Sequence, residues 1–186
     1  MKINDLEQYE DRIVLYLDIL GFSNKIKGSS DENESFENIK ELLNKLENQK
    51  ELSDKWNNEN DTYDFQVSLF SDSLIISVPL KIKNGFYDLV KAAIFVMHDL
   101  IYSGFIARGG ITVGKFYHSG NVAFGPALIE AVELEKNAKY TKIILTKNIY
   151  NRLIMNLDNN EYQEITQIVL RDFVVYITKD EEYFLD

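Results

Sequence analysis

A chain of 186 residues fits one compact domain that is large enough to bury a core. Its 45% hydrophobic and 12% aromatic residues exclude an intrinsically disordered protein, and the absence of cysteine excludes disulfides and thiolate metal sites. The 30 acidic and 20 basic residues give a net charge of −10, which argues against a surface that grips a nucleic-acid backbone.

The first residues (MKINDLE) contain no apolar stretch, so we expect no secretory signal. No apolar run approaches the roughly 20 residues that a membrane span needs. We therefore expect a soluble, cytoplasmic protein with a single domain over residues 1–186 and no contact with a membrane. The chain stops just after an apolar segment, which leaves open whether the protein continues beyond residue 186.

The N-terminal third predicts one strand and one helix. Residues 12–20 (RIVLYLDIL) form a near-continuous apolar run that only Asp18 interrupts, which indicates a buried central strand. A polar, helix-breaking stretch follows at 28–34, and Ser35 is placed to cap a helix. Apolar residues then recur at helical spacing, namely Phe36, Ile39, Leu42, Leu43 and Leu46. Residues 47–62 are almost entirely polar and predict a helix end and a surface loop.

The middle of the chain predicts a hairpin and a long helix. Residues 62–70 alternate between apolar and polar, and 74–78 form a second short strand. The polar turn between them carries Asp72 at its tip. Residues 86–101 give the clearest amphipathic pattern of the chain and end at Gly104, a suitable residue after a helix.

The C-terminal part continues the alternation of strands and helices. We expect a strand at 105–117, a helix from Pro126 to about Ala138, a strand at 142–145, and a helix capped by Thr146. The tail adds apolar strand segments near 165–170, 173–177 and 183–185. This order predicts an α+β domain with a mostly antiparallel sheet covered by helices.

Two aspartates stand out as candidates for chemistry. Asp18 lies inside an apolar strand, where a carboxylate is costly unless it is paired, protonated or bound to a metal. Asp72 at a hairpin tip is individually ordinary. Two aspartates on neighbouring strand ends would suit a pair of divalent ions, while a structural Asp18 that caps the following turn is an equally good interpretation.

Four segments together resemble a known family. Residues 17–23 (LDILGFS) resemble the D-I-x-G-F-[ST] segment of class III nucleotidyl cyclases, and Asp72 stands where that family has its second metal aspartate. Residues 108–114 (RGGITVG) and 125–135 (GPALIEAVELE) are similar to its glycine-containing strand and to its next helix. The resemblance runs from about residue 12 to 145 and implies the palm, ferredoxin-like architecture of that family.

The resemblance implies a metal-dependent active site. Two Mn²⁺ or Mg²⁺ ions would be held by Asp18, Asp72 and the carbonyl of Ile19. The backbone amides of the following turn would receive the triphosphate, from Leu20, Gly21, Phe22 and Ser23. The family's sites are completed by a second chain, so the resemblance implies a homodimer with the helix from Pro126 near its interface.

In the reaction that the resemblance implies, negative charge develops on the α-phosphate in the transition state, and a positively charged side chain held near it would stabilise that charge. Arg108 is the first candidate, and a strand arginine paired with a surface carboxylate is the competing interpretation. Lys115 and Lys142 are further candidates. Lys25 and Lys27 follow the phosphate turn and are either helpers or solvated side chains. The isolated residues His98 and His118 form no metal cluster or triad, so we interpret both as structural or solvated.

Several positions depart from the family pattern. Ser68 and Val122 replace the lysine and the aspartate that select a purine, and with Phe22 they are the expected base pocket. Ile129 and Glu133 replace the asparagine and the arginine that stabilise the transition state. An ordinary adenylate or guanylate cyclase is therefore not expected.

The particular motif combination resembles the bacterial pyrimidine cyclases of the Pycsar antiphage system. That branch implies conversion of UTP or CTP to a 3′,5′-cyclic nucleotide and pyrophosphate, with the product acting on a separate effector. The preference for UTP over CTP rests on the resemblance alone. The alternative is a non-catalytic cyclase-homology domain for dimerisation or ligand sensing, which Ile129 and Glu133 favour. A diguanylate-cyclase palm is disfavoured because the hairpin reads SDS and not GGDEF.

Overall fold

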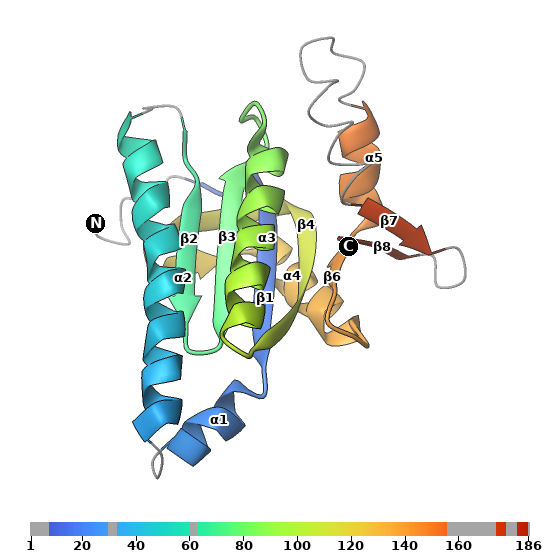
Figure 1. Ribbon diagram of the computed structural model, residues 1–186. Coiled ribbons are helices and arrows are strands. Elements are labelled where there is room, and N and C mark those ends of the chain that lie inside the picture. Colours follow the sequence, from blue (N-terminus) through green and yellow to red (C-terminus); the bar gives the residue numbers. More distant parts are fainter. Residues whose placement is uncertain (1–7, 30–32, 60–62, 156–173, 178–181, 186) are drawn as a thin grey trace.

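The computed structural model describes residues 8–29, 33–59, 63–155, 174–177 and 182–185 (Figure 1). Its centre is an eight-stranded sheet in the order β2-β3-β1-β4-β6-β8-β7, with β5 paired to β4. The strands are β1 (Glu10–Leu20), β2 (Gln66–Phe70), β3 (Ser73–Pro79), β4 (Ile106–Ser119), β5 (Val122–Phe124), β6 (Ile143–Leu145), β7 (Val174–Ile177) and β8 (Glu182–Leu185). The helices are α1 (Phe22–Ser29), α2 (Asn33–Glu59), α3 (Gly85–Tyr102), α4 (Pro126–Asn137) and α5 (Lys147–Met155).

Strand β1 is the central strand, as its apolar run predicts. It pairs antiparallel with β3 on one side and with β4 on the other. The pairing of β4 with β6 is parallel, so the sheet is mostly antiparallel. Alternate side chains of β1 point to opposite faces, and both faces are covered, which explains why the run is apolar on both faces up to Asp18.

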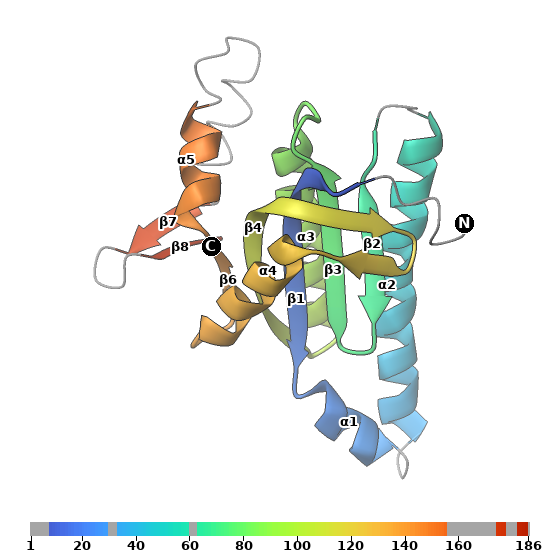
Figure 2. The ribbon, with the colours of Figure 1, turned by 180° about the vertical axis from the view of Figure 1, so that it is seen from behind.

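Helices cover both faces of the sheet. Figure 1 shows α2 and α3 in front of β2, β3 and β1, and Figure 2 shows α4 and the β4–β5 hairpin on the other side. The larger core lies under α2 and α3 and includes Leu15, Leu17 and Ile76. A smaller core under α4 contains Val14, Ile75, Phe116, Ala127 and Ala131. The predicted α+β architecture is confirmed.

Most predicted elements are present at close to their predicted bounds. The β2–β3 hairpin, α3 ending before Gly104, α4 from Pro126 and α5 are confirmed. The hydroxyl of Thr146 accepts a hydrogen bond from the Ile149 amide at 3.2 Å, as expected of a cap. In the tail, β7 and β8 match two of the three expected segments, and 165–170 lies outside the described residues.

Two expectations about the fold are wrong, and two elements were not predicted. Residues 47–59 belong to α2, which also begins at Asn33, so Ser35 lies inside the helix and is not its cap. Tertiary hydrogen bonds explain the length of α2, because the Asn57 side chain donates to the Phe65 carbonyl (2.7 Å) and accepts from its amide (2.9 Å). Helix α1 and strand β5 were not predicted. Helix α1 is short and polar, and the buried Phe22 anchors it.

Helix α4 lies unusually close to β4, and glycine makes this possible. A Cβ atom added to Gly110 would lie 2.4 Å from the carbonyl oxygen of Ala131 and 2.5 Å from Cβ of Leu134. The neighbouring Gly109 is equally restricted by the carbonyl oxygen of Tyr16, at 2.4 Å. The two glycines of the RGGITVG segment are thus required by packing on both faces of β4.

We expect the substitution Gly110→Ala to lower the free energy of unfolding by about 1–3 kcal/mol, because α4 must move to admit the methyl group. Urea denaturation followed by circular dichroism measures this change. Gly28→Ala is the matched control, since nothing lies within 4 Å of its added Cβ. Equal stability of Gly110→Ala and the parent protein would contradict the packing argument.

Candidate active site

The two candidate aspartates meet where β1 ends beside the β2–β3 turn. The amide of Ile19 donates to the carbonyl oxygen of Asp72 at 2.8 Å, which ties the end of β1 to this turn. Asp18 stands opposite Ser73 on β3 and opposite Arg108 on β4. Directly opposed residues in antiparallel strands share a face, so Asp18, Ser73 and Arg108 all lie on the α4 side of the sheet. The structure therefore brings Asp18, Asp72 and Arg108 together.

The Asp18 carboxylate lies in a region of negative charge. Partial burial raises the pKa of Asp18, and the charges of Glu135 and Asp72 raise it further, while Arg108 opposes the shift. The same cluster acts on Tyr16, whose pKa is raised chiefly by burial. The Tyr16 hydroxyl lies 2.8 Å from that of Ser73. Carboxylates that repel one another at a half-buried site favour a bound cation.

Arg108 is paired with a carboxylate, but not with a surface one. Its Nε donates to Glu135, whose side chain is only 5% exposed, whereas that of Arg108 is 31% exposed. Glu135 reaches this position because α4 packs close to β4. Sequence reasoning assigned no role to Glu135. The only available signal was its place at the end of the segment 125–135.

The other candidate lysines that the structure describes have contacts of their own. Lys115 forms an ion pair with Asp11 at 3.1 Å. Asp11 lies seven residues before Asp18 on β1, so this ion pair is about 24 Å from Asp18. The Lys142 ammonium lies over the Phe184 ring, 5.5 Å from its centroid. Lys25 donates to the Gly104 carbonyl at 2.8 Å and lies over the Phe105 ring, which gives it a structural role. Lys27 is exposed on α1.

The expected phosphate turn joins β1 to α1. Gly21 has φ of +74°, a conformation that favours glycine, and its carbonyl accepts from the amides of Asn24 and Lys25 at 3.1 Å each. The residues Leu20, Gly21, Phe22 and Ser23 therefore span the strand end and the first turn of α1. Amides in the first turn of a helix have no acceptor inside the helix and point towards its N-terminal end, where anions bind.

The oxygen ligands around Asp18 fit a hard divalent cation. The carboxylates of Asp18 and Asp72 come from adjacent chain segments that the Ile19 amide holds together. Burial, and then the charges of Glu135 and Asp72, raise the pKa of Asp18. Mg²⁺ and Mn²⁺ prefer such oxygen ligands. Within the described ranges, no group of three or more His, Cys, Asp and Glu side chains is arranged to hold a metal ion. Backbone carbonyl and substrate oxygens must therefore complete any metal site here.

The three residues expected to form a base pocket are not together. The Phe22 side chain is buried in the core under α2 and packs on Phe105, with ring centroids 6.0 Å apart. Ser68 is fully buried on the opposite face, beneath the β4–β5 hairpin, and Val122 is 40% exposed on that hairpin. Within a single chain, the side chains of Phe22 and Ser68 are therefore too buried to contact a bound base.

Ser68 belongs to a buried chain of hydrogen bonds that starts at Arg12. Arg12 Nε donates to Ser77 Oγ (2.9 Å), and Ser77 Oγ lies 2.8 Å from His118 Nδ1. On the other side of the ring, His118 Nε2 lies 2.7 Å from Ser68 Oγ, which donates to the Gly120 carbonyl (2.6 Å). Arg12 is in turn paired with Glu10 and Asp64. His118 thus has a structural role, as one of the two interpretations expected.

These contacts fix the direction of every proton. Ser68 has a single hydroxyl hydrogen, which Gly120 accepts, so the hydrogen between Ser68 and His118 must belong to Nε2. Neutral His118 then accepts at Nδ1 from Ser77, and Ser77 accepts from Arg12. Burial lowers the pKa of His118 to about 3, with a further contribution from Arg12. This chain of hydrogen bonds therefore keeps the His118 ring neutral and links the tip of the β4–β5 hairpin to the sheet.

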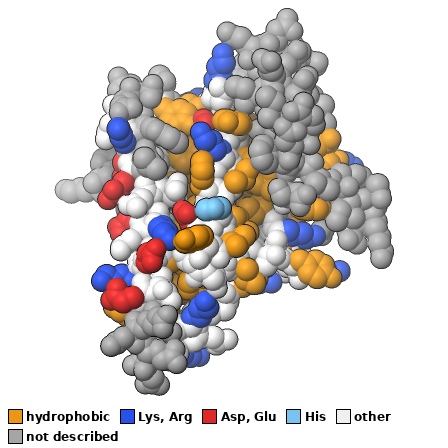
Figure 3. All heavy atoms as spheres, viewed as in Figure 1, with side chains coloured by type: hydrophobic (Ala, Val, Ile, Leu, Met, Phe, Trp, Pro, Cys, Tyr) orange, Lys and Arg blue, Asp and Glu red, His pale blue; other side chains and the backbone are white. Residues whose placement is uncertain are grey.

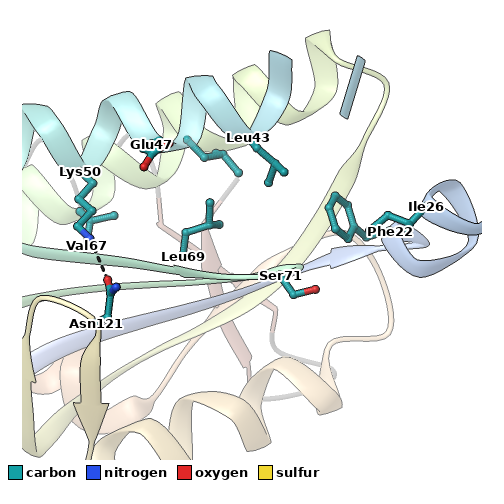
Figure 4. A pocket seen from close by; sticks show the side chains of 10 residues that line it. Phe22, Ile26, Leu43, Glu47, Lys50, Val67, Leu69, Ser71 and Asn121 are labelled. Atoms are coloured by element: carbon teal, nitrogen blue, oxygen red, sulfur yellow. Dashed lines mark hydrogen bonds between the residues drawn. The ribbon is translucent and has the colours of Figure 1, made fainter. Parts of the chain in front are cut away.

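A cavity lies at the edge of the sheet. It encloses about 440 Å³ between α1, α2 and β2, and its lining includes Phe22, Leu46, Lys50 and Ser71 (Figure 4). Lys50 donates across it to Asn121 at 2.9 Å. Asp18, Asp72 and Arg108 do not line this cavity, so it is separate from the cluster on the α4 side.

We expect the substitution His118→Phe to lower the free energy of unfolding by about 1–3 kcal/mol at neutral pH, because Ser68 and Ser77 lose buried partners. His98→Phe is the control, since the His98 side chain is 73% exposed. The pKa of His118 is depressed in the folded state, so its stabilising contribution is complete above pH 6.5 and declines as the pH falls towards about 3. Urea denaturation between pH 4 and 8 should show this decline in the parent protein and a weaker one in His118→Phe.

Solved structures share this fold at low sequence identity. The catalytic core of a rhodopsin-guanylyl cyclase with converted specificity, solved in complex with ATPαS, superposes with a TM-score of 0.58 at 13% identity over 96% of each chain. A class III adenylyl cyclase-like ATP-binding protein from Pseudomonas aeruginosa gives a TM-score of 0.56 at 13% identity, over 91% of this chain and 43% of that one. No family model and no curated protein sequence matches. None of the described helices is long and apolar enough to cross a membrane. The chain therefore has the fold of the class III nucleotidyl cyclase catalytic domain.

Proposed function

We propose that the protein is a metal-dependent nucleotidyl cyclase that converts a ribonucleoside triphosphate to a 3′,5′-cyclic nucleotide and pyrophosphate. The observation that carries the proposal is the half-buried Asp18, which lies beside Asp72 and Glu135 on a cyclase fold. A structural aspartate that capped the next turn would not require two further carboxylates around it. Divalent ions on Asp18, Asp72 and the Ile19 carbonyl would neutralise the triphosphate and lower the pKa of the ribose 3′-hydroxyl.

The residues of the chain have distinct parts in this proposal. The amides from Leu20 to Ser23 receive phosphate oxygens at the N-terminal end of α1, where the helix dipole favours an anion. Arg108 stands opposite Asp18 and donates to Glu135, so it is the β4 side chain in direct register with the proposed metal ligand Asp18. Its guanidinium has donors beyond Nε for the charge that develops on the phosphate.

We propose further that the substrate is a pyrimidine triphosphate, with UTP favoured over CTP, and that the product is an antiviral second messenger acting on a separate effector. The motif resemblance supports this proposal. The structure adds a physical argument. The Ser68 hydroxyl is already hydrogen-bonded to His118 and to the Gly120 carbonyl, and the Val122 side chain is apolar. Neither position offers the charged contacts that select a purine, and a site without those partners loses that discrimination.

A non-catalytic dimerisation or ligand-sensing domain is the second candidate. Ile129 and Glu133 are both exposed on α4, at the positions where the related family has transition-state donors. Loss of one such donor typically costs roughly 10²–10³ in rate. An active protein therefore needs Arg108 or a residue of a second chain to replace them.

We propose that the active unit is a homodimer. Val122 (40% exposed), Phe124 (40%) and Ile129 (65%) are exposed apolar residues of β5 and α4, on the same side of the sheet as Asp18, and together we call them the apolar strip. A symmetric pair of chains would bury such a strip twice. Light scattering should give twice the chain mass of 21.6 kDa. A fully active monomer would contradict the proposal.

We expect Asp18→Ala and Asp72→Ala each to abolish binding of Mn²⁺ in the presence of nucleoside triphosphate, because each removes a carboxylate ligand. Isothermal titration calorimetry on the purified protein measures this directly and does not depend on turnover. Asp11→Ala is the matched control on the same strand, since Asp11 pairs with Lys115 far from the site. Unchanged Mn²⁺ binding in both site variants would rule out the metal site.

A competition assay tests the reaction and the substrate together. The protein is incubated with equimolar ATP, GTP, CTP and UTP plus Mn²⁺, and cyclic products are identified by mass spectrometry. We expect cyclic UMP to predominate over cyclic CMP, with purine products below about a tenth of the total, the ratio that 1.4 kcal/mol of discrimination gives. Predominant cyclic AMP or cyclic GMP would refute the pyrimidine proposal. No product from a folded dimer would support the non-catalytic candidate.

A further inference from the structure

A second cavity lies between α2 and α3, on the face of the sheet opposite Asp18. It encloses about 310 Å³, which is within the range of small-molecule sites. Its floor is formed by the buried side chains of Phe65, Val67 and Ile76 on the sheet. Ala92 and Phe95 of α3 form one wall, and Phe95 is 52% exposed at the surface. The two helices stand in front of the sheet in Figure 1, and Figure 3 shows apolar side chains gathered on this face.

One carboxylate stands in this apolar lining. Asp88 is on the first turn of α3, where the helix dipole alone would explain an exposed aspartate. Asp88 is instead half-buried in the cavity wall, and the Tyr63 hydroxyl donates to its Oδ2 at 2.6 Å. Tyr63 stacks on Phe65 with ring centroids 6.2 Å apart, so the direction of the carboxylate is fixed. Within the part of the chain that the structure describes, Oδ1 of Asp88 remains an acceptor at the edge of an apolar space.

The nearest basic side chain only partly offsets this charge. Lys91 also borders the cavity, but its ammonium lies 6.0 Å from the centroid of the Tyr87 ring and its side chain is exposed. Burial raises the pKa of Asp88, although the hydrogen bond from Tyr63 and the charge of Lys91 oppose the shift. A cation delivered into the cavity would therefore be stabilised by Asp88 more than an exposed ion pair would be.

We propose that this cavity binds a small amine with an aromatic or branched apolar body. The ammonium would donate to Asp88 Oδ1, and the apolar body would lie on Phe65 and Val67 beside Phe95. Aromatic rings add attraction for a neighbouring cation. The acceptor is oriented by Tyr63 before the ligand arrives, so little ordering accompanies binding. The site needs neither nucleotide nor metal and lies across the sheet from Asp18.

Three indole probes that differ only in their head group test the charge requirement on the unmodified chain. Tryptamine carries an ammonium, tryptophol a hydroxyl and indole-3-propionate a carboxylate. Titration of uniformly ¹⁵N-labelled protein, followed by amide chemical shifts, gives the affinity and the location of each probe. We expect tryptamine to shift α2 and α3 resonances and to bind at least tenfold more tightly than the carboxylate. Equal affinities, shifts confined to other elements, or no binding of tryptamine would overturn the proposal.

Variants separate the carboxylate from the cavity itself. Asp88→Asn keeps an acceptor for Tyr63 and should weaken tryptamine binding at least tenfold while leaving tryptophol unchanged. Ala92→Phe fills the space and should abolish binding of both. Asp99→Asn, on the same helix outside the cavity, should change nothing. Tryptamine binding that survives in Asp88→Asn would also overturn the proposal. If a variant does not fold, the three probes on the parent chain decide the question.

Discussion

The contact between α4 and β4 is the constraint on which the candidate active site depends. It exists because Gly110 has no side chain, so the backbone of Ala131 can lie against the strand. The contact carries Glu135 to the level of Arg108, and Arg108 stands opposite Asp18 in the strand register. The charges around Asp18 thus depend on the absence of a side chain at Gly110 on the neighbouring strand β4. A bulkier residue at position 110 would move the carboxylate that orients the arginine.

The sequence predicts most of the fold because local patterns and tertiary packing agree along most of the chain. The apolar run of β1, the alternation in β2 and the helical spacing in α3 all persist in the structure. Prediction fails where tertiary contacts decide. Residues 47–59 are too polar to indicate a helix, yet Asn57 forms two hydrogen bonds with the Phe65 backbone and holds them in α2. A three-residue strand such as β5 leaves almost no periodic signal.

The candidate active site is also only partly predictable from the sequence. Asp18 and Asp72 are visible in the sequence, because one interrupts an apolar run and the other occupies a turn. The partner of Arg108 is not, since Glu135 lies 27 residues away and only the packing of α4 brings it near. Ser68 also cannot be interpreted from its motif position alone. Its burial depends on His118 and Gly120, which a different strand and its turn supply.

The directed order of the Arg12-to-Gly120 chain also limits how this part of the sequence can evolve. Each of its hydroxyls both donates and accepts, so replacing Ser68, Ser77 or His118 alone leaves a buried neighbour without its partner. Reversing the direction would require the other histidine tautomer and a donor in place of the Gly120 carbonyl, which a backbone cannot provide. Substitutions at these three positions are therefore coupled, and homologues that lose the histidine should have changed both serines with it.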